Sequence, residues 1–251
     1  NFVHYNWHWF WDTGNGDTGN QGVHEMDIAR WAIKGATMPN RVWSIGGRYV
    51  PGEKDQGQTP NMQISVYEYD EAILLFETRG LVGKSGSPDR NVSNEYYTTE
   101  GMIKGGTFYP KNGGASIQAK GEAAPVTPGG AFGSFIHAVR SRDNADINCD
   151  AEVAHYSAAL CHLGNISYRL GKQDTFSGND NPFGKNEQIK SSLDMLQNNL
   201  KAVKIDLNET TVAVGRDLKF DPATESFPGD KQADALLTRP YRKPYIVPEI
   251  S

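Results

Sequence analysis

Four stretches of the sequence carry apolar side chains at the three- and four-residue spacing that places them on one side of a helix. Gly35 and Gly171 follow two of these stretches, where a helix commonly ends, and Asn148 precedes the third as its expected cap. The predicted helices span Val23–Lys34, Phe132–Arg142, Asp150–Leu170 and Gln188–Val203.

Between the first two helices the pattern changes to the two-residue period of β-strands. Apolar residues at 62, 64 and 66 alternate with Gln63 and Ser65, which predicts a strand with one buried face. Further strands are predicted over Arg41–Val50, Ala72–Thr78, Glu95–Thr99, Met102–Tyr109 and Ser116–Lys120. Their connections have hairpin length, so we expect antiparallel pairing, and no linker divides the chain. The sequence therefore predicts one α+β domain over residues 1–251.

Charge and composition narrow the classes of partner. The formal net charge is −5 at pH 7, and lysines and arginines are scattered without a basic block, so neither a nucleic acid nor a membrane surface is expected to bind. No apolar run could span a bilayer, so a soluble protein is expected, and the choice between a cytoplasmic and a periplasmic location stays open. Cys149 and Cys161 are too few for a disulfide framework and leave the compartment open.

Gly14, Gly16 and Gly19 match the dinucleotide-binding pattern G-x-G-x-x-G letter for letter. That pattern works only where a buried parallel strand precedes it and a βαβ unit follows. Here the preceding residues, HYNWHWFWD, contain no valine or isoleucine, and the next strands are predicted to be antiparallel. We therefore expect a loop that lets the backbone pass close to a ligand or to the helix start, rather than a nucleotide site.

Asn20, His24 and Asp27 are spaced four and three residues apart, so on a helix they share one side, opposite the apolar stripe. The positive potential at a helix N-terminus would favour a developing oxyanion and keep the imidazole of His24 neutral. A neutral histidine beside a polar partner can remove a proton from a hydroxyl group. The alternative is that His24 and Asp27 are solvated surface residues and that Asn20 only caps the helix.

No metal site is expected. The zinc motif H-E-x-x-H begins at His24 but has Ile28 where the second histidine is needed. His4 and His8 are spaced like metal ligands, but no cysteine or carboxylate cluster completes a site.

Tyr5, Trp7, Trp9 and Trp11 alternate at period two. A strand of the core is one interpretation. The other is a platform for a sugar ring, because these side chains combine an apolar face with a polar group. In both cases the aromatic residues would lie near the glycine-rich stretch and the helix of His24.

The pattern G-x-H-x-x-D-x-x-R-W over residues 22–31 resembles the second domain of the glucose–fructose oxidoreductase/inositol dehydrogenase/MocA family, particularly bacterial members with an HYNWHWFW-type run before a glycine-rich loop. The segments NEYYTTEGMIKGG, SFIHAVRSR, HYSAALCHLGNISYRLG and LLTRPYRKPYIVPE are also similar to that subgroup. The resemblance therefore extends over nearly the whole chain.

The resemblance implies an N-terminal Rossmann domain that binds NAD or NADP, followed by an α+β domain. The sheet of that second domain would be open and mainly antiparallel, with helices on one face, and would often form a homo-oligomer interface. The histidine at the position of His24 would act as acid and base on the substrate, and Asp27 would contact it. The residue four before the histidine is usually aspartate, and here it is Asn20. The lysine of the Rossmann E-K-P motif has no counterpart in these 251 residues.

These implications make the chain the substrate-side domain of an NAD(P)-dependent oxidoreductase that acts on a sugar, cyclitol or related polyol. His24 and Asn20 would be catalytic, with Asp27, Tyr5, Trp7 and Trp9 binding the substrate, and the domain alone would be inactive. One alternative is a sugar lyase or glycoside-cleaving enzyme that reduces NAD only transiently. Another is a non-catalytic module for carbohydrate binding or oligomerisation, which the replacement of aspartate by Asn20 favours.

Overall fold

A computed structural model describes residues 4–50, 55–81, 92–121, 125–176 and 181–248. Its centre is a six-stranded sheet in the order β3-β2-β1-β9-β8, with β10 also paired to β1, and every pairing is antiparallel. The strands are β1 (Arg41–Gly47), β2 (Met62–Glu68), β3 (Ile73–Arg79), β8 (Lys172–Thr175), β9 (Thr211–Val214) and β10 (Leu218–Lys219). The predicted α+β class with mainly antiparallel strands is confirmed.

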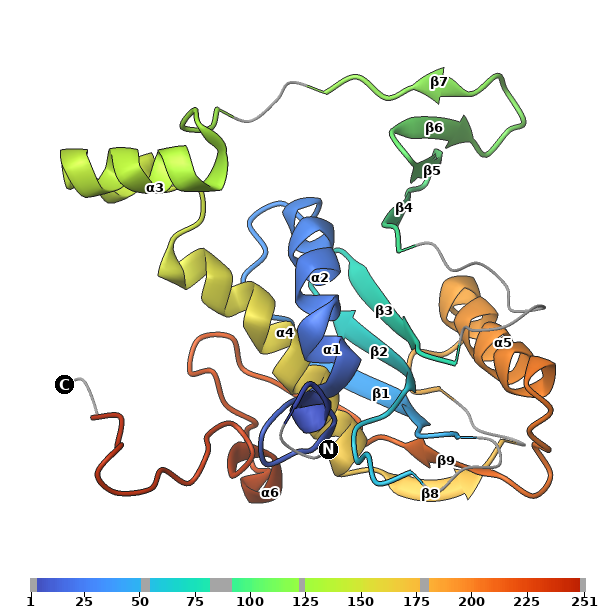
Figure 1. Cartoon of the computed structure of the whole chain (residues 1–251). Helices are drawn as coiled ribbons and strands as arrows, with labels where there is room; N and C mark the ends of the chain where they lie inside the picture. Colours follow the sequence, from blue (N-terminus) through green and yellow to red (C-terminus); the bar gives the residue numbers. More distant parts are fainter. Residues whose placement is uncertain (1–3, 51–54, 82–91, 122–124, 177–180, 249–251) are drawn as a thin grey trace.

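Helices cover both faces of this sheet, so the prediction of an open sheet with helices on one face is wrong. One face packs against α2 (Gly22–Trp31) and α4 (Ala151–Arg169), and Met26, Tyr67 and Leu160 meet in its core (Figure 1). The other face packs against α5 (Glu187–Ala202), where Ile189 and Leu200 join a separate core. Helices α4 and α5 therefore lie on opposite faces of the sheet. The domain has three layers, helix–sheet–helix, instead of the two layers that helices on one face would give.

Strand β2 shows why both faces are covered. Met62, Ile64 and Val66 point into the core beneath α5, as their alternation predicts. Gln63 and Ser65 point the other way but are not solvated, since they are 1% and 0% exposed. The prediction that this strand has only one buried face is therefore wrong.

A layer of hydrogen-bonded polar groups lies between the sheet and α4. Ser44 Oγ lies 2.9 Å from Ser65 Oγ and donates to the Gly164 carbonyl at 2.8 Å, while Gln63 Nε2 donates to Ser65 Oγ at 3.0 Å. A Cβ at Gly164 would lie only 2.4 Å from Tyr67 Oη, so glycine is what lets α4 approach the sheet this closely. These polar groups tolerate burial because they bond to one another.

The helix boundaries lie within three residues of those predicted, but one cap differs. The N-terminus of α4 is capped by Asp150, whose Oδ1 accepts from the Val153 backbone NH at 2.8 Å. Asn148, the predicted cap, instead bonds both backbone groups of Thr127. Helix α5 begins at a cap provided by Asn186.

Two parts of the chain stand away from the central sheet at the same end of the molecule (Figure 1). The first is a four-stranded antiparallel sheet, called here the arm: β4 (Glu95–Tyr97), β5 (Gly101–Lys104), β6 (Thr107–Pro110) and β7 (Ile117–Gln118). The second is helix α3 (Gly130–Ser141), followed by the short 3-10 helix η2 (Asn144–Asp146). The single strand predicted over Met102–Tyr109 is a hairpin, because Gly105 and Gly106 both take positive φ and turn the chain.

The remaining elements are short. A 3-10 helix, η1 (Asn6–Trp9), precedes α1 (Gly16–Asn20) near the start of the chain, and α6 (Lys231–Asp234) lies in the C-terminal segment.

Candidate functional site around His24

Helices α1 and α2 form one nearly continuous helical run. Gln21, which joins them, has helical backbone angles of φ −72° and ψ −34°, and the His24 backbone NH donates to the Gln21 carbonyl at 3.1 Å. The run starts at Gly16, whose φ of +71° suits glycine. His24 therefore lies in the first turn of α2, as predicted, but α1 runs into that turn through Gln21, so it is not a free helix N-terminus. The positive potential expected there belongs to α1 instead.

The side chains of Asn20 and His24 lie one helical turn apart and both are exposed. Within the described part of the chain, no side-chain hydrogen bond or ion pair engages either of them. This is the arrangement that the spacing predicted: an imidazole and an amide on the outer side of a helix whose inner side is anchored by Met26. Both groups are free to meet a ligand from solvent.

Asp27 is engaged in holding α2 against α4. Its Oδ1 accepts from Ser157 Oγ at 2.5 Å and from Trp31 Nε1 at 3.2 Å, and it lies 3.6 Å from the Arg30 guanidinium. The partner on α4 is 130 residues away in the sequence, so spacing alone could not indicate this role. A contact between Asp27 and a substrate stays a prediction, and it would fall to Oδ2.

Arg30 completes this anchor. It is buried, and it donates from Nε to Ser157 Oγ at 3.0 Å and to the carbonyls of Ala36 and Val153 at 2.8 Å and 3.3 Å. A buried guanidinium with three acceptors fixes two helices in one register. The helix that presents His24 is therefore rigidly supported from below.

Glu25 is a neighbour of the site that sequence reasoning missed. Its two carboxylate oxygens accept from Gln21 Nε2 at 3.0 Å and from Asn94 Nδ2 at 3.1 Å, which links α2 to the residue just before the arm. Burial and the charge of Glu25 raise the pKa of Tyr96, so this arm residue also lies near α2. The four-residue spacing of Gln21 and Glu25 was the available signal. The surface beside His24 is thus bordered by polar groups from two elements.

The aromatic run forms a 3-10 helix and turn rather than the core strand that its alternation allowed. Buried His8 lies at its centre, with Nδ1 2.5 Å from the Tyr5 carbonyl oxygen and the Tyr5 and Trp7 rings edge-on to it. Tyr5 and Trp7 remain largely exposed, whereas Trp9 is half-buried beneath the Arg48 guanidinium, 5.8 Å from its ring centre. Two exposed aromatic faces suit a sugar ring, and that role stays a prediction.

The glycine-rich stretch does not fit a nucleotide. A Cβ at Gly14 would lie 2.4 Å from the His8 Cα, and one at Gly19 would lie 2.1 Å from the Asn15 side chain. These glycines are required for packing within the protein, and the element before them is η1 rather than a strand. The loop that we expected here is mostly the helix α1, so that prediction is wrong. The described residues of this segment offer no cradle for NAD or NADP.

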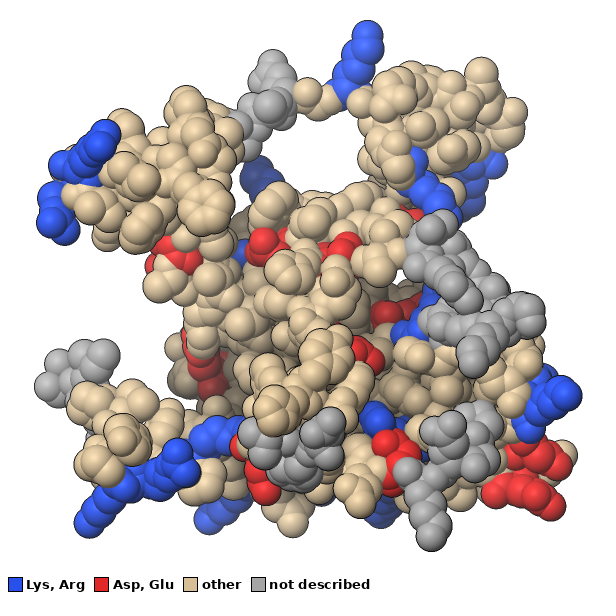
Figure 2. Space-filling model, viewed as in Figure 1, with Lys and Arg blue, Asp and Glu red and all other residues tan. Residues whose placement is uncertain are grey.

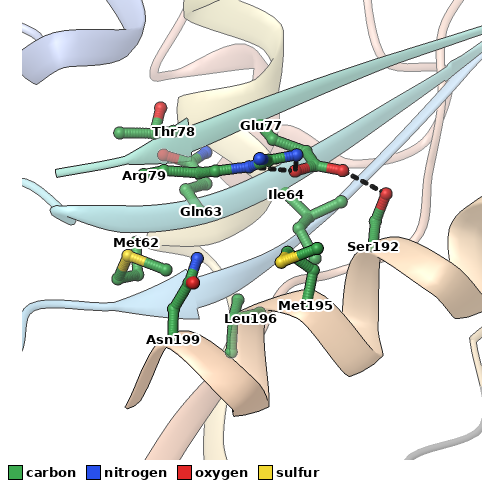
Figure 3. Close-up of a pocket in the computed structure, with 10 residues that line it drawn as sticks. All are labelled: Met62, Gln63, Ile64, Glu77, Thr78, Arg79, Ser192, Met195, Leu196 and Asn199. Atoms are coloured by element: carbon green, nitrogen blue, oxygen red, sulfur yellow. Dashed lines mark hydrogen bonds and ion pairs between the residues drawn. The ribbon is translucent and has the colours of Figure 1, made fainter. Parts of the chain in front are cut away.

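A hollow of about 170 Å³, partly open to solvent, lies between α5 and strands β2 and β3 (Figure 3). Its polar groups already bond to one another, because Glu77 is paired with Arg79 and accepts from Ser192 Oγ. The Asn199 Oδ1 atom is buried there without a partner among the described residues, which suits a single water. This hollow is on the α5 face, opposite α2, so it is separate from the surface of His24.

Nowhere in the described residues do three or more histidine, cysteine, aspartate or glutamate side chains gather as metal ligands would. None of the described helices combines the length and apolar character needed to cross a bilayer. The chain matches no family model, no curated protein and no solved structure.

Proposed function

We propose that this chain is the substrate-binding part of an NAD(P)-dependent oxidoreductase that acts on a sugar, cyclitol or related polyol. The observation that carries the proposal is the exposed imidazole of His24, which bonds to no side chain of the described residues, one turn from Asn20 on a helix that Arg30 fixes to α4. The sequence resemblance supplies the reaction class, and the geometry of α2 supports the role of the histidine.

His24 transfers a proton to or from the reacting oxygen of the substrate. A neutral imidazole has one nitrogen that can accept the proton of a hydroxyl group, and the protonated ring returns it when a carbonyl is reduced. Exposure lets the substrate reach this nitrogen directly. Rigid support matters because proton transfer requires the two heavy atoms to lie within hydrogen-bonding distance.

Asn20 orients the substrate or the imidazole through its amide. An amide can both donate and accept a hydrogen bond, but it carries no charge and cannot stabilise a protonated imidazole as a carboxylate would. His24 is therefore expected to work with less electrostatic assistance than in family members that have aspartate at this position.

The polar groups beside His24 suit a polyhydroxylated ligand. The hydrogen-bonded set of Gln21, Glu25 and Asn94 offers donors and acceptors from both α2 and the base of the arm. Such fixed pairs can bind ring hydroxyls. Tyr5 and Trp7 expose their aromatic faces on η1, and their contact with the same ligand stays a prediction.

The nicotinamide of NAD or NADP, when bound, would accept or supply the hydride. Because the described residues do not fit the nucleotide, the proposal places it on a domain outside these 251 residues. What this chain contributes is the binding of the substrate and the movement of one proton at His24.

The test uses the complete protein with a panel of sugars and cyclitols, NAD or NADP, and the absorbance of reduced nicotinamide. We expect His24→Ala to lower kcat/KM by about 100-fold or more, the usual contribution of a general acid or base. His155→Ala is the matched control, since His155 is an exposed histidine on α4 whose partner is Glu225. Its kcat/KM should stay within about twofold of the wild-type value.

Three results would contradict the proposal. Equal activity of the His24→Ala and wild-type proteins would exclude the role of the histidine. Product formation without net nicotinamide reduction would indicate the lyase that uses the cofactor transiently, and substrate binding without any product would indicate a non-catalytic module.

A further inference from the structure

Helix α3 exposes an apolar stripe to solvent. The stripe consists of Phe132, Phe135, Ile136 and Val139. Phe132 is 87% exposed and Phe135 63%, while Ser134 and Ala138 on the opposite side are buried. At about 200 Å² for an aromatic side chain, the two phenylalanines alone expose on the order of 300 Å². This is as large as the largest apolar patch on many monomers.

The arm also has an apolar face that is only partly shielded from solvent. The strand register places one row across all four strands on a single face: Tyr96, Ile103, Phe108 and Ile117. No residue of the arm from 95 to 118 is buried. The opposite face carries the ion pair of Lys104 with Glu95 at 2.5 Å, beside the row of Tyr97, Met102 and Tyr109. The row of Tyr96 therefore defines an uncharged face of a single-layer sheet.

Neither the α3 stripe nor the apolar face of the arm packs against another described element. A small sheet becomes stable when its apolar face packs against another element, and an amphipathic helix needs the same. Within one copy, α3 and the arm lie on opposite sides of the upper end of the molecule (Figure 1), and they form separate lobes in the space-filling view (Figure 2). The helix is thus complementary to the arm of the same chain but does not contact it.

We propose that the occupant of both surfaces is a second copy of this chain, with each α3 stripe packed on the apolar face of the other copy's arm. A two-fold axis makes this exchange reciprocal, because each copy then supplies one helix and one sheet. By their exposed fractions, the stripe and the arm row together present roughly 600 Å² per copy, at the lower end of the size of stable interfaces. Neither surface carries a charge, so no unpaired ion is buried.

The assembly differs from an oligomer formed through the central sheet. Both faces of that sheet are occupied by helices of the same chain, so it offers no open face to a partner. The proposed interface also adjoins the candidate site, since Asn94 at the base of the arm bonds to Glu25 beside His24.

The experiment measures the mass of the complete protein in solution by sedimentation over a range of concentrations. One variant, Phe132→Glu with Phe135→Glu, puts charge on the helix stripe, and a second, Phe108→Glu with Ile117→Glu, puts charge on the arm. We expect a wild-type dimer and at least 100-fold weaker self-association for each variant. Ile28→Glu, an exposed isoleucine on α2, is the matched control and should leave the dimer intact.

Mixing the two variants distinguishes this interface from others. In a mixed dimer, the intact arm of the helix variant meets the intact helix of the arm variant, so one complete contact remains. We therefore expect the mixture to form a heterodimer more tightly than either variant forms a homodimer. Recovery in the mixture also shows that both variants are folded.

Three results would overturn the proposal. A wild-type protein that is monomeric at all concentrations would mean that α3 and the arm meet within one copy or cover another domain. An arm variant that remains dimeric while the helix variant dissociates would indicate pairing of α3 with α3. Variants that keep their circular dichroism but show no recovery on mixing would exclude the reciprocal contact.

Discussion

The central sheet and the arm are both antiparallel, but they are stabilised in different ways. Strand β2 of the central sheet is buried on both faces, by α4 and by α5, so its apolar side chains contribute to cores within one copy. The arm has no buried residue: Tyr96, Ile103 and Phe108 of its apolar row are half-buried, and Ile117 is exposed. A similar alternation of apolar residues thus gives a sheet covered on both faces in the central body, and a single-layer sheet without a covering helix in the arm.

The central body and the arm therefore have different roles. The central body is complete within one copy, and it fixes the helix that carries His24. The arm and α3 lack cover, and they depend on contacts that a single copy does not supply. Substitutions should therefore affect the two regions differently, in size and in their dependence on protein concentration.

The largest effect is expected in the body. Leu160 is fully buried against the sheet, and Leu160→Ala should lower the free energy of unfolding by about 3–5 kcal/mol because it leaves a cavity. Ile117→Ala in the arm should change it by less than about 0.5 kcal/mol in dilute solution, because this side chain is exposed. Urea denaturation of both variants measures the contrast. Similar losses would show that the arm is part of the same core.

A smaller effect is expected at the anchor beneath His24. Asp27→Ala removes the acceptor of Ser157 and Trp31, so it should lower the free energy of unfolding by about 1–3 kcal/mol. Glu71→Ala, in an exposed turn, is the control and should have little effect. If Asp27→Ala abolished turnover without any loss of stability, the main role of this carboxylate would be in substrate binding.

The body should also lose stability at alkaline pH. Burial raises the pKa of Cys161 to about 12, from an ordinary value near 9.0. The unfolded thiol therefore ionises first, so stability is full below pH 9 and falls between pH 9 and 12, by about 1 kcal/mol per pH unit. Unfolding measured from pH 8 to 11 should show a shallower slope for Cys161→Ala. Cys149→Ala, at an exposed position, should keep most of the wild-type slope.

The smallest change is expected at Asn20. Asn20→Asp places a carboxylate one turn from His24, where it would stabilise the protonated imidazole. The acidic limb of the pH profile of kcat/KM should therefore move to higher pH, with a rate change of about tenfold or less. An unchanged profile would mean that Asn20 and His24 do not act together.

The sequence predicted the fold best where a pattern was local and continuous. The stripe that includes Ile189, Leu196 and Leu200 gave α5 to within about a residue, and short connections gave the antiparallel pairing. The hairpin turn at Gly105 was missed because apolar residues on both sides resemble one long strand. Which face each helix covers could not be read from any one segment, because it depends on how distant segments pack.

For the candidate site too, the sequence predicted the local features and missed those that depend on tertiary packing. The exposed side shared by Asn20 and His24 follows from their spacing, which is local. The place of His24 inside a longer helix was missed because the glycines around Gly16 indicated a loop, and their packing is visible only in three dimensions. Burial of Gln63 likewise depends on Thr18 and Ser65, partners that only the tertiary structure brings together.

Amide hydrogen exchange of the wild-type protein, followed at several concentrations, tests the comparison between body and arm most directly. We predict slow exchange in β1, β2 and α4 at every concentration. In α3 and the arm we predict fast exchange in dilute solution and slow exchange as the dimer forms. Slow exchange in α3 and the arm of a dilute monomer would contradict the account, because these elements would then be complete within one copy.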